Sequence, residues 1–142
     1  MWDWLSFDDL MQIAETVYGV PAEILEGQVC IFRAQASLAA PFIRVRGVLL
    51  HPDPVERAVI CALRMIRTRP FPGRRNTVAG FWCMREMLVR SHYLWLRPGE
   101  DAKEIDRVLR QVEARAKSDA EFLRWVQDRV ELGTGLDDGP TA

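Results

Sequence analysis

The sequence has few of the residues that form disulfide frameworks or metal centres. Its 142 residues include three cysteines and two histidines, and no two cysteines have the Cys-x-x-Cys spacing of zinc and redox sites. Cys30, Cys61 and Cys83 lie among apolar residues, so we expect reduced thiols in the core of a cytoplasmic protein. The composition argues against a disulfide-stapled domain and against a zinc site.

Long apolar runs are also lacking. No run approaches the roughly 20 residues needed to span a bilayer, and the N-terminus does not begin with a basic stretch followed by an apolar one. We therefore expect no membrane association. With 49% apolar residues the chain can bury one core. We expect residues 1–132 to form a single domain and residues 133–142 to be a disordered tail.

Basic residues are missing from the first 32 residues, and acidic residues are scarce in the next 65. Residues 1–32 contain six acids and no lysine or arginine, and residues 33–97 contain twelve arginines but only three acids. Residues 98–142 contain eleven acids and seven bases. This segregation favours a focused site for an anionic ligand. We do not expect nucleic-acid binding, because no helix-turn-helix, zinc or RNA-binding signature is present.

The spacing of apolar residues predicts an all-α protein. A capping box at Ser6 and Asp9 predicts a helix that ends at Gly19. A further helical stretch is interrupted near residue 27 and closed by Pro41.

The middle of the chain predicts two consecutive core helices. Asp53-Pro54 is a helix start, with an N-cap followed by proline at the first helical position. The second of these helices, about residues 74–91, is apolar on nearly every face, as expected for a central buried helix. Gly80 within it would allow a neighbouring helix to approach closely.

The C-terminal part predicts a short extended segment and two more helices. The extended segment is Tyr93–Leu96, and an amphipathic helix follows over about residues 100–117. A capping box at Ser118 predicts a last helix that includes Val130 and ends at Gly133.

Residues 42–50 differ from the rest of the chain. Apolar β-branched residues alternate with Arg44 and Arg46, and Gly47 follows. This pattern predicts a short β-hairpin, with an extended loop as the alternative.

An arginine-rich junction separates the two core helices. Two prolines and Gly73 stop the first helix, and Asn76 or Thr77 can cap the second. The free amides of that second helix would favour an anion, and Arg69, Arg74 and Arg75 would add donors suited to phosphate. The alternative is that these arginines belong to a solvated turn.

The order of these features resembles the Fic/Doc family, and in particular its short, single-domain Doc-like branch. That family has a loop reading H-P-F-x-[D/E]-G-N-[G/K]-R between two core helices, and residues 70–73 and 77–79 match it in kind and place. Residues 38–41, 57–59 and 118–125 resemble flanking parts of the family, so the resemblance extends from Leu5 to Leu132. It implies a helical bundle around the central helix, with the hairpin at residues 42–50 as a flap.

The departures from the family pattern concern the catalytic residues. Arg69 stands where the family has the histidine that acts as general base, and arginine cannot take that role near neutral pH. The family's acidic metal ligand is missing, since no carboxylate lies between Glu56 and Glu86. The resemblance therefore implies a degenerate site without family-type magnesium binding, and we expect no cofactor. AMP transfer or kinase activity conflicts with both losses.

By resemblance, the part of the family site that binds anions is retained. By resemblance the ligand-binding residues are Phe71, Gly73, Arg74, Arg75, Asn76 and Thr77, to which the flap would add Arg44 and Arg46. Arg69 and His51 are the candidate catalytic residues, His51 as a substitute base or, alternatively, a surface residue.

Two functions follow from this reading. The first is a binding protein whose arginine-lined pocket takes a nucleotide such as ATP, another phosphorylated or carboxylated molecule, or a protein partner. The second is a repurposed enzyme, of isomerase, cyclase or lyase type, in which Arg69 stabilises developing negative charge without a metal. Trp82 and Trp95 would favour a flat apolar ligand if they lined the cleft, but their sequence context predicts that both lie in the core.

Overall fold

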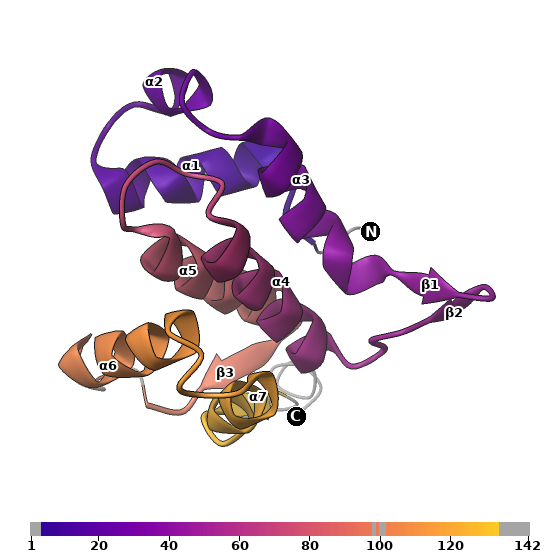
Figure 1. Cartoon of the computed structure of the whole chain (residues 1–142). Helices are drawn as coiled ribbons and strands as arrows, with labels where there is room; N and C mark the ends of the chain where they lie inside the picture. The colour runs from indigo at the N-terminus through magenta and orange to yellow at the C-terminus, as the bar shows by residue number, and fades with distance from the viewer. Residues whose placement is uncertain (1–3, 98, 100–101, 134–142) are drawn as a thin grey trace, which may run out of the picture.

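The structure, a computed structural model, describes residues 4–97, 99 and 102–133. This part of the chain is mainly helical, with two small antiparallel sheets (Figure 1). Its elements in chain order are α1 (Phe7–Tyr18), α2 (Ala22–Glu26), α3 (Ile31–Ala39), the 3₁₀ turn η1 (Ala40–Phe42), β1 (Arg44–Val45), β2 (Val48–Leu49), α4 (Pro54–Thr68), α5 (Asn76–Arg90), β3 (Tyr93–Trp95), α6 (Ala102–Glu113), α7 (Asp119–Gln127) and β4 (Val130–Leu132).

Helices α4 and α5 form the centre of the molecule. The Asp53 carboxylate accepts a hydrogen bond from the Val55 amide at 3.3 Å, which confirms the predicted start of α4. Gly80 permits the close packing of α4 on α5, because a Cβ at this position would lie 3.2 Å from the Ala62 carbonyl oxygen. The predicted close approach at Gly80 is therefore confirmed.

The N-terminal helices cover one side of this pair. Ser6 and Asp9 form the predicted capping box, and Gly19 ends α1 in the left-handed conformation with φ of 72°. Helix α3 ends at Ala39 with Ala40 as its C-cap, directly before Pro41 as predicted, and the chain continues through Pro41 as the 3₁₀ turn η1. Proline is tolerated there because its missing amide would have had no helical partner.

The predicted hairpin is present. Strands β1 and β2 pair in antiparallel register, with Arg44 opposite Leu49. Arg46 and Gly47 form the two-residue turn with φ of 52° and 80°, as a turn matched to the right-handed twist of the strands requires.

The C-terminal prediction was partly wrong. The Ser118 capping box is present, but α7 ends at Gln127, and Val130 belongs to strand β4, which pairs with β3. The Gly133 amide donates to the His92 carbonyl at 2.7 Å instead of capping a helix. The segment pairs as a strand because β3 offers a free edge beside it. The predicted tail, apart from Gly133, lies outside the described residues.

The part of the chain that the structure describes contains no helix with the length and apolar character needed to cross a membrane.

Candidate functional site

The loop between α4 and α5 begins with an arginine in an unusual conformation. Arg69 ends α4 with φ of 53°, and its amide donates to the Met65 carbonyl at 3.1 Å. The Arg69 guanidinium turns back within the loop, where Nη2 donates to the Gly73 carbonyl at 3.2 Å. Gly73 also has a positive φ, 75°. These two residues reverse the chain direction between the helices.

Asn76 holds the loop together from inside, and the prediction that Asn76 or Thr77 caps α5 was wrong. Arg75 is the N-cap residue and makes no side-chain capping bond, while Asn76 is the first helical residue. The Asn76 side chain accepts from the Phe71 amide at 3.0 Å and donates to the Phe71 carbonyl at 2.9 Å. Both backbone groups are buried and need partners, and Asn76 supplies them.

The loop is anchored on α1 and on the start of α3. The buried Phe71 ring contacts Tyr18, and the Tyr18 hydroxyl donates to the Pro72 carbonyl at 2.8 Å. The Cys30 amide donates to the Pro70 carbonyl at 2.7 Å. Burial raises the Tyr18 pKa, and the positive charges of Arg75 and Arg69 partly oppose this. Tyr18 therefore stays a neutral hydrogen-bond donor.

The arginines of the loop remain available to an anion, whereas the first residues of α5 are covered. Asn76 and Thr77 expose only 1% and 6% of their surface, so a ligand outside the loop cannot reach their amides. Arg69, Arg74 and Arg75 are exposed. Arg74 makes no hydrogen bond within the part of the chain described, and the other two use only part of their donor capacity.

The hairpin residues lie far from this loop. The hairpin precedes α4 and the loop follows it, so a helix of 15 residues separates them, which is about 22 Å at 1.5 Å per residue. Figure 1 shows the hairpin projecting from the end of the molecule opposite the loop. The structure therefore does not bring Arg44 and Arg46 to the loop arginines.

His51 also lies at the hairpin end. Its Nδ1 is 2.5 Å from the Glu56 Oε1, and Arg44 donates to the Gly47 carbonyl within its own turn. These side chains stabilise the junction of the hairpin with α4.

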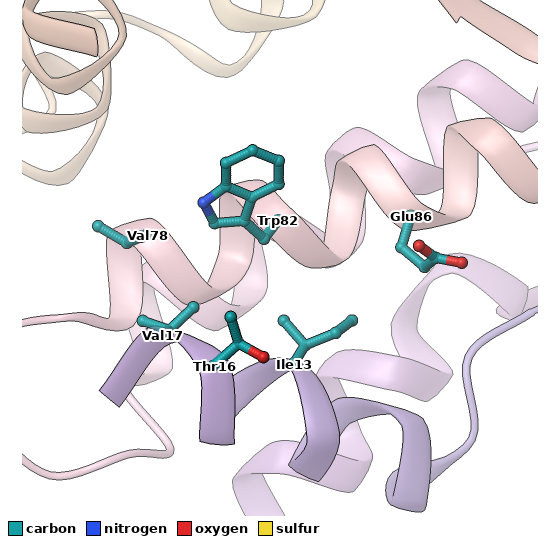
Figure 2. Close-up of a pocket in the computed structure, with 6 residues that line it drawn as sticks. All are labelled: Ile13, Thr16, Val17, Val78, Trp82 and Glu86. Atoms are coloured by element: carbon teal, nitrogen blue, oxygen red, sulfur yellow. The ribbon is translucent and has the colours of Figure 1, made fainter. Parts of the chain in front are cut away.

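A cavity of about 380 Å³ lies between α1 and α5, next to the loop. Figure 2 shows the six side chains that line it: Ile13, Thr16, Val17, Val78, Trp82 and Glu86. Most of these side chains are apolar, and Glu86 lies two helical turns beyond Val78. The cavity therefore has an apolar body and a carboxylate at one end.

Trp82 forms a wall of this cavity, so the prediction that it lies in the core was wrong. Its exposed fraction is 48%, and the Arg85 guanidinium lies 5.5 Å from its ring centroid. Trp95 is half-buried and packs against Phe81 and Trp125, as predicted for a core residue.

Arg75 links the cavity to the loop. Its Nη1 donates to the Val17 carbonyl at 2.8 Å, and the Val17 side chain lines the cavity. Sequence reasoning identified Arg75, but it assigned Trp82 to the core and missed the contribution of α1. The sequence contained a signal for this contribution. Helix α5 is apolar on nearly every face, whereas the apolar stripe of α1 is too narrow to cover the face of α5 that it packs against.

In the described residues, no three histidine, cysteine, aspartate or glutamate side chains converge as metal ligands would. The chain was compared with known proteins in three ways, and no protein-family model, curated protein or solved structure matches it.

Proposed function

We propose that this chain is a Fic/Doc-type domain that binds a small anionic ligand and does not transfer nucleotidyl or phosphoryl groups. The anionic group lies against the loop arginines, and the apolar part lies in the α1–α5 cavity beside Trp82. The observation that carries this proposal is the position of Arg75, whose guanidinium is bonded to the Val17 carbonyl at the edge of the cavity.

The lack of transfer chemistry follows from the residues at the loop. Arg69 replaces the histidine of the family that this sequence resembles, and a guanidinium stays protonated in proteins. No carboxylate occurs between Glu56 and Glu86 to hold magnesium at the loop. Charge on the ligand is therefore neutralised by arginine and not by a metal ion.

A nucleotide fits this arrangement of side chains. An aromatic base can stack on the exposed ring of Trp82, its phosphates can pair with Arg74 and Arg75, and the Glu86 carboxylate can accept a hydrogen bond from an exocyclic amine. A volume of about 380 Å³ lies within the usual range of ligand pockets.

Isothermal titration calorimetry with AMP, ADP and ATP tests the proposal. We expect binding of at least one nucleotide with the same affinity in the presence and absence of magnesium. Arg74→Gln should weaken it about tenfold, the loss of one charged hydrogen bond of roughly 1.5 kcal/mol. Trp82→Ala should weaken it by a similar factor, whereas Arg124→Gln on the exposed face of α7 should have no effect.

Two results would contradict the proposal. Magnesium-dependent ATP binding would show that a metal site is retained. Affinity that is unchanged in both Arg74→Gln and Trp82→Ala would place the nucleotide elsewhere on the molecule.

The alternative, metal-free catalysis by Arg69, has less support. The Arg69 guanidinium donates to the Gly73 carbonyl inside the loop, and Arg69 does not line the cavity. The Arg69 side chain would have to break its hydrogen bond to Gly73 to reach a substrate in the cavity.

A further inference from the structure

A second arginine-rich cleft, of about 310 Å³, lies on the opposite side of α4 from α5, beside the turn that joins α6 to α7. Its lining residues are Ile60, Leu63, Arg64, Arg67, Thr68, Arg115 and Asp119. None of them lines the α1–α5 cavity. This cleft is therefore a separate site, and its occupation does not depend on the function proposed above.

The cleft has an excess of positive charge. It contains three guanidinium groups and one carboxylate, which gives a net charge of +2. Asp119 pairs with Arg67, and this hydrogen bond keeps the Asp119 pKa below its usual value, so the carboxylate is charged at neutral pH. The guanidinium groups of Arg64 and Arg115 belong to exposed residues and make no hydrogen bond or ion pair within the described residues.

Arg67 has an unused donor in this cleft. Its Nε is buried and has no hydrogen-bond acceptor in the part of the chain described. A buried donor without a partner is costly, so an acceptor supplied by a ligand would be stabilising once the Arg67 side chain turns this nitrogen toward the cleft. A fourth guanidinium adds positive charge at the same end, since Arg33 Nη1 donates to the Thr68 carbonyl at 3.3 Å.

The floor of the cleft is apolar. Leu63 is buried and Ile60 is half-buried. Arg115 follows α6 in the left-handed conformation, with φ of 60°, and lines the same cleft. The cleft thus combines arginine walls with a hydrocarbon floor.

We propose that this cleft binds a phosphate monoester, with the phosphate between Arg64, Arg67 and Arg115 and the organic part on Ile60 and Leu63. At neutral pH a phosphate monoester has a charge near −2 and three acceptor oxygens, which match the excess charge and the arginine donors. An uncharged ligand would leave the guanidinium groups of Arg64 and Arg115 unpaired, and a monoanion would neutralise less of the excess charge.

NMR titration with phenyl phosphate tests this site directly. We expect the Nε–Hε resonance of Arg67 to shift and saturate, and inorganic phosphate to bind more weakly because it does not contact the apolar floor. In the double variant Arg64→Gln/Arg115→Gln the affinity read from this resonance should fall at least tenfold. Both arginines are exposed, so the fold should be retained, which the amide spectrum checks.

Two controls separate this cleft from the loop and from unspecific attraction. Arg74→Gln removes a loop arginine and should leave the Arg67 titration unchanged, even if the loop binds a ligand of its own. Asp119→Asn should tighten binding by removing the competing carboxylate, whereas Asp128→Asn, an equal change of charge at the exposed C-cap of α7, should not.

The proposal is overturned if millimolar phenyl phosphate leaves the Arg67 resonance unshifted, or if the double variant binds as tightly as the wild type. It is also overturned if Asp128→Asn tightens binding as much as Asp119→Asn, because the attraction would then be unspecific. Equal binding of phenyl phosphate and inorganic phosphate would refute the role of Ile60 and Leu63.

Discussion

Arg69 occupies a backbone conformation that glycine tolerates better than arginine. Its φ is 53°, and the left-handed region costs a residue with a Cβ about 1–2 kcal/mol. Most helices that end this way have glycine at the corresponding position. Strain of this kind is often found at functional sites, and here it places a guanidinium within the loop of the candidate site.

Arg69→Gly should therefore raise the free energy of unfolding, by about 1 kcal/mol, while it weakens anion binding at the loop. Urea denaturation and nucleotide calorimetry measure the two effects. Arg74→Gly is the matched control, because it removes the same charge from the same loop at a residue without positive φ. If the free energy of unfolding changes equally in both variants, relief of backbone strain at Arg69 does not explain the change.

The three cysteines differ in accessibility. Burial raises the Cys61 pKa to about 12 and the Cys83 pKa well above its usual value, whereas Cys30 is half-buried at the start of α3. The sequence predicted all three as core residues, and this is right only for the two within α4 and α5.

In native protein at neutral pH, a thiol reagent should therefore modify Cys30 first, and Cys61 and Cys83 only when the protein unfolds. Thiolates are the reactive species, and raised pKa values together with burial suppress them. Mass spectrometry of peptides after timed labelling identifies the modified residues. In Cys30→Ser the fast reaction should disappear; fast labelling of Cys61 or Cys83 in that variant would contradict the burial argument.

The packing of α4 on α5 depends on the absence of a side chain at position 80. Although alanine is favoured over glycine in a helix by about 1 kcal/mol, a Cβ at Gly80 would lie 3.2 Å from the Ala62 carbonyl oxygen and 3.3 Å from the Ile66 Cγ1. The backbone carbonyl cannot move without shifting α4.

Gly80→Ala should thus lower the free energy of unfolding, because overpacking costs of about 1–3 kcal/mol exceed the gain in helix propensity. Gly27→Ala is the control, since a Cβ there meets only the Ile24 carbonyl oxygen at 3.6 Å. Guanidinium denaturation of both variants measures the difference. Equal stability of Gly80→Ala and wild type would mean that the helices separate at little cost.

Elements with a local signal could be predicted from the sequence. The capping boxes at Ser6 and Ser118, the Asp53-Pro54 helix start and the Arg46-Gly47 turn each depend on neighbouring residues, and all are present. Asn76 was misassigned because its partner is the buried backbone of Phe71. Strand β4 was missed because only its pairing with β3 distinguishes it from a helix end.

The candidate site was only partly predictable, for a reason that concerns the whole molecule. The loop arginines adjoin one another in sequence, but the cavity beside them requires α1 to lie along α5. The hairpin arginines were expected at the same place, yet α4 holds the two regions apart. Such distances depend on how the helices pack, and no local pattern encodes them.

A single cluster at Asp9 connects the start of the chain to the end of the central helix. The Asp9 carboxylate accepts from the Ser6 amide at 3.0 Å and from Arg90 Nη1 at 3.0 Å, and Arg90 also donates to the Trp4 carbonyl at 3.2 Å. The hydrogen bond from the Ser6 backbone is the main cause that lowers the Asp9 pKa, and the hydrogen bond from Arg90 is the second. The contacts of Asp9 in this cluster therefore stabilise the fold most when Asp9 is ionised.

Acidification should remove this contribution. Because the folded-state pKa of Asp9 lies below its unfolded value, the stabilisation is complete above the unfolded pKa of about 3.9 and is lost as the pH falls through the folded pKa. Asp9→Asn should cost about 0.5–1 kcal/mol at neutral pH, a modest value because the carboxylate is partly exposed and screened, and this deficit should shrink in strong acid. Urea denaturation across the pH range measures it. Asp8→Asn removes the same charge from the same helical turn without breaking the Arg90 contact, so a pH dependence equally changed in both variants would assign the effect to the helix dipole instead.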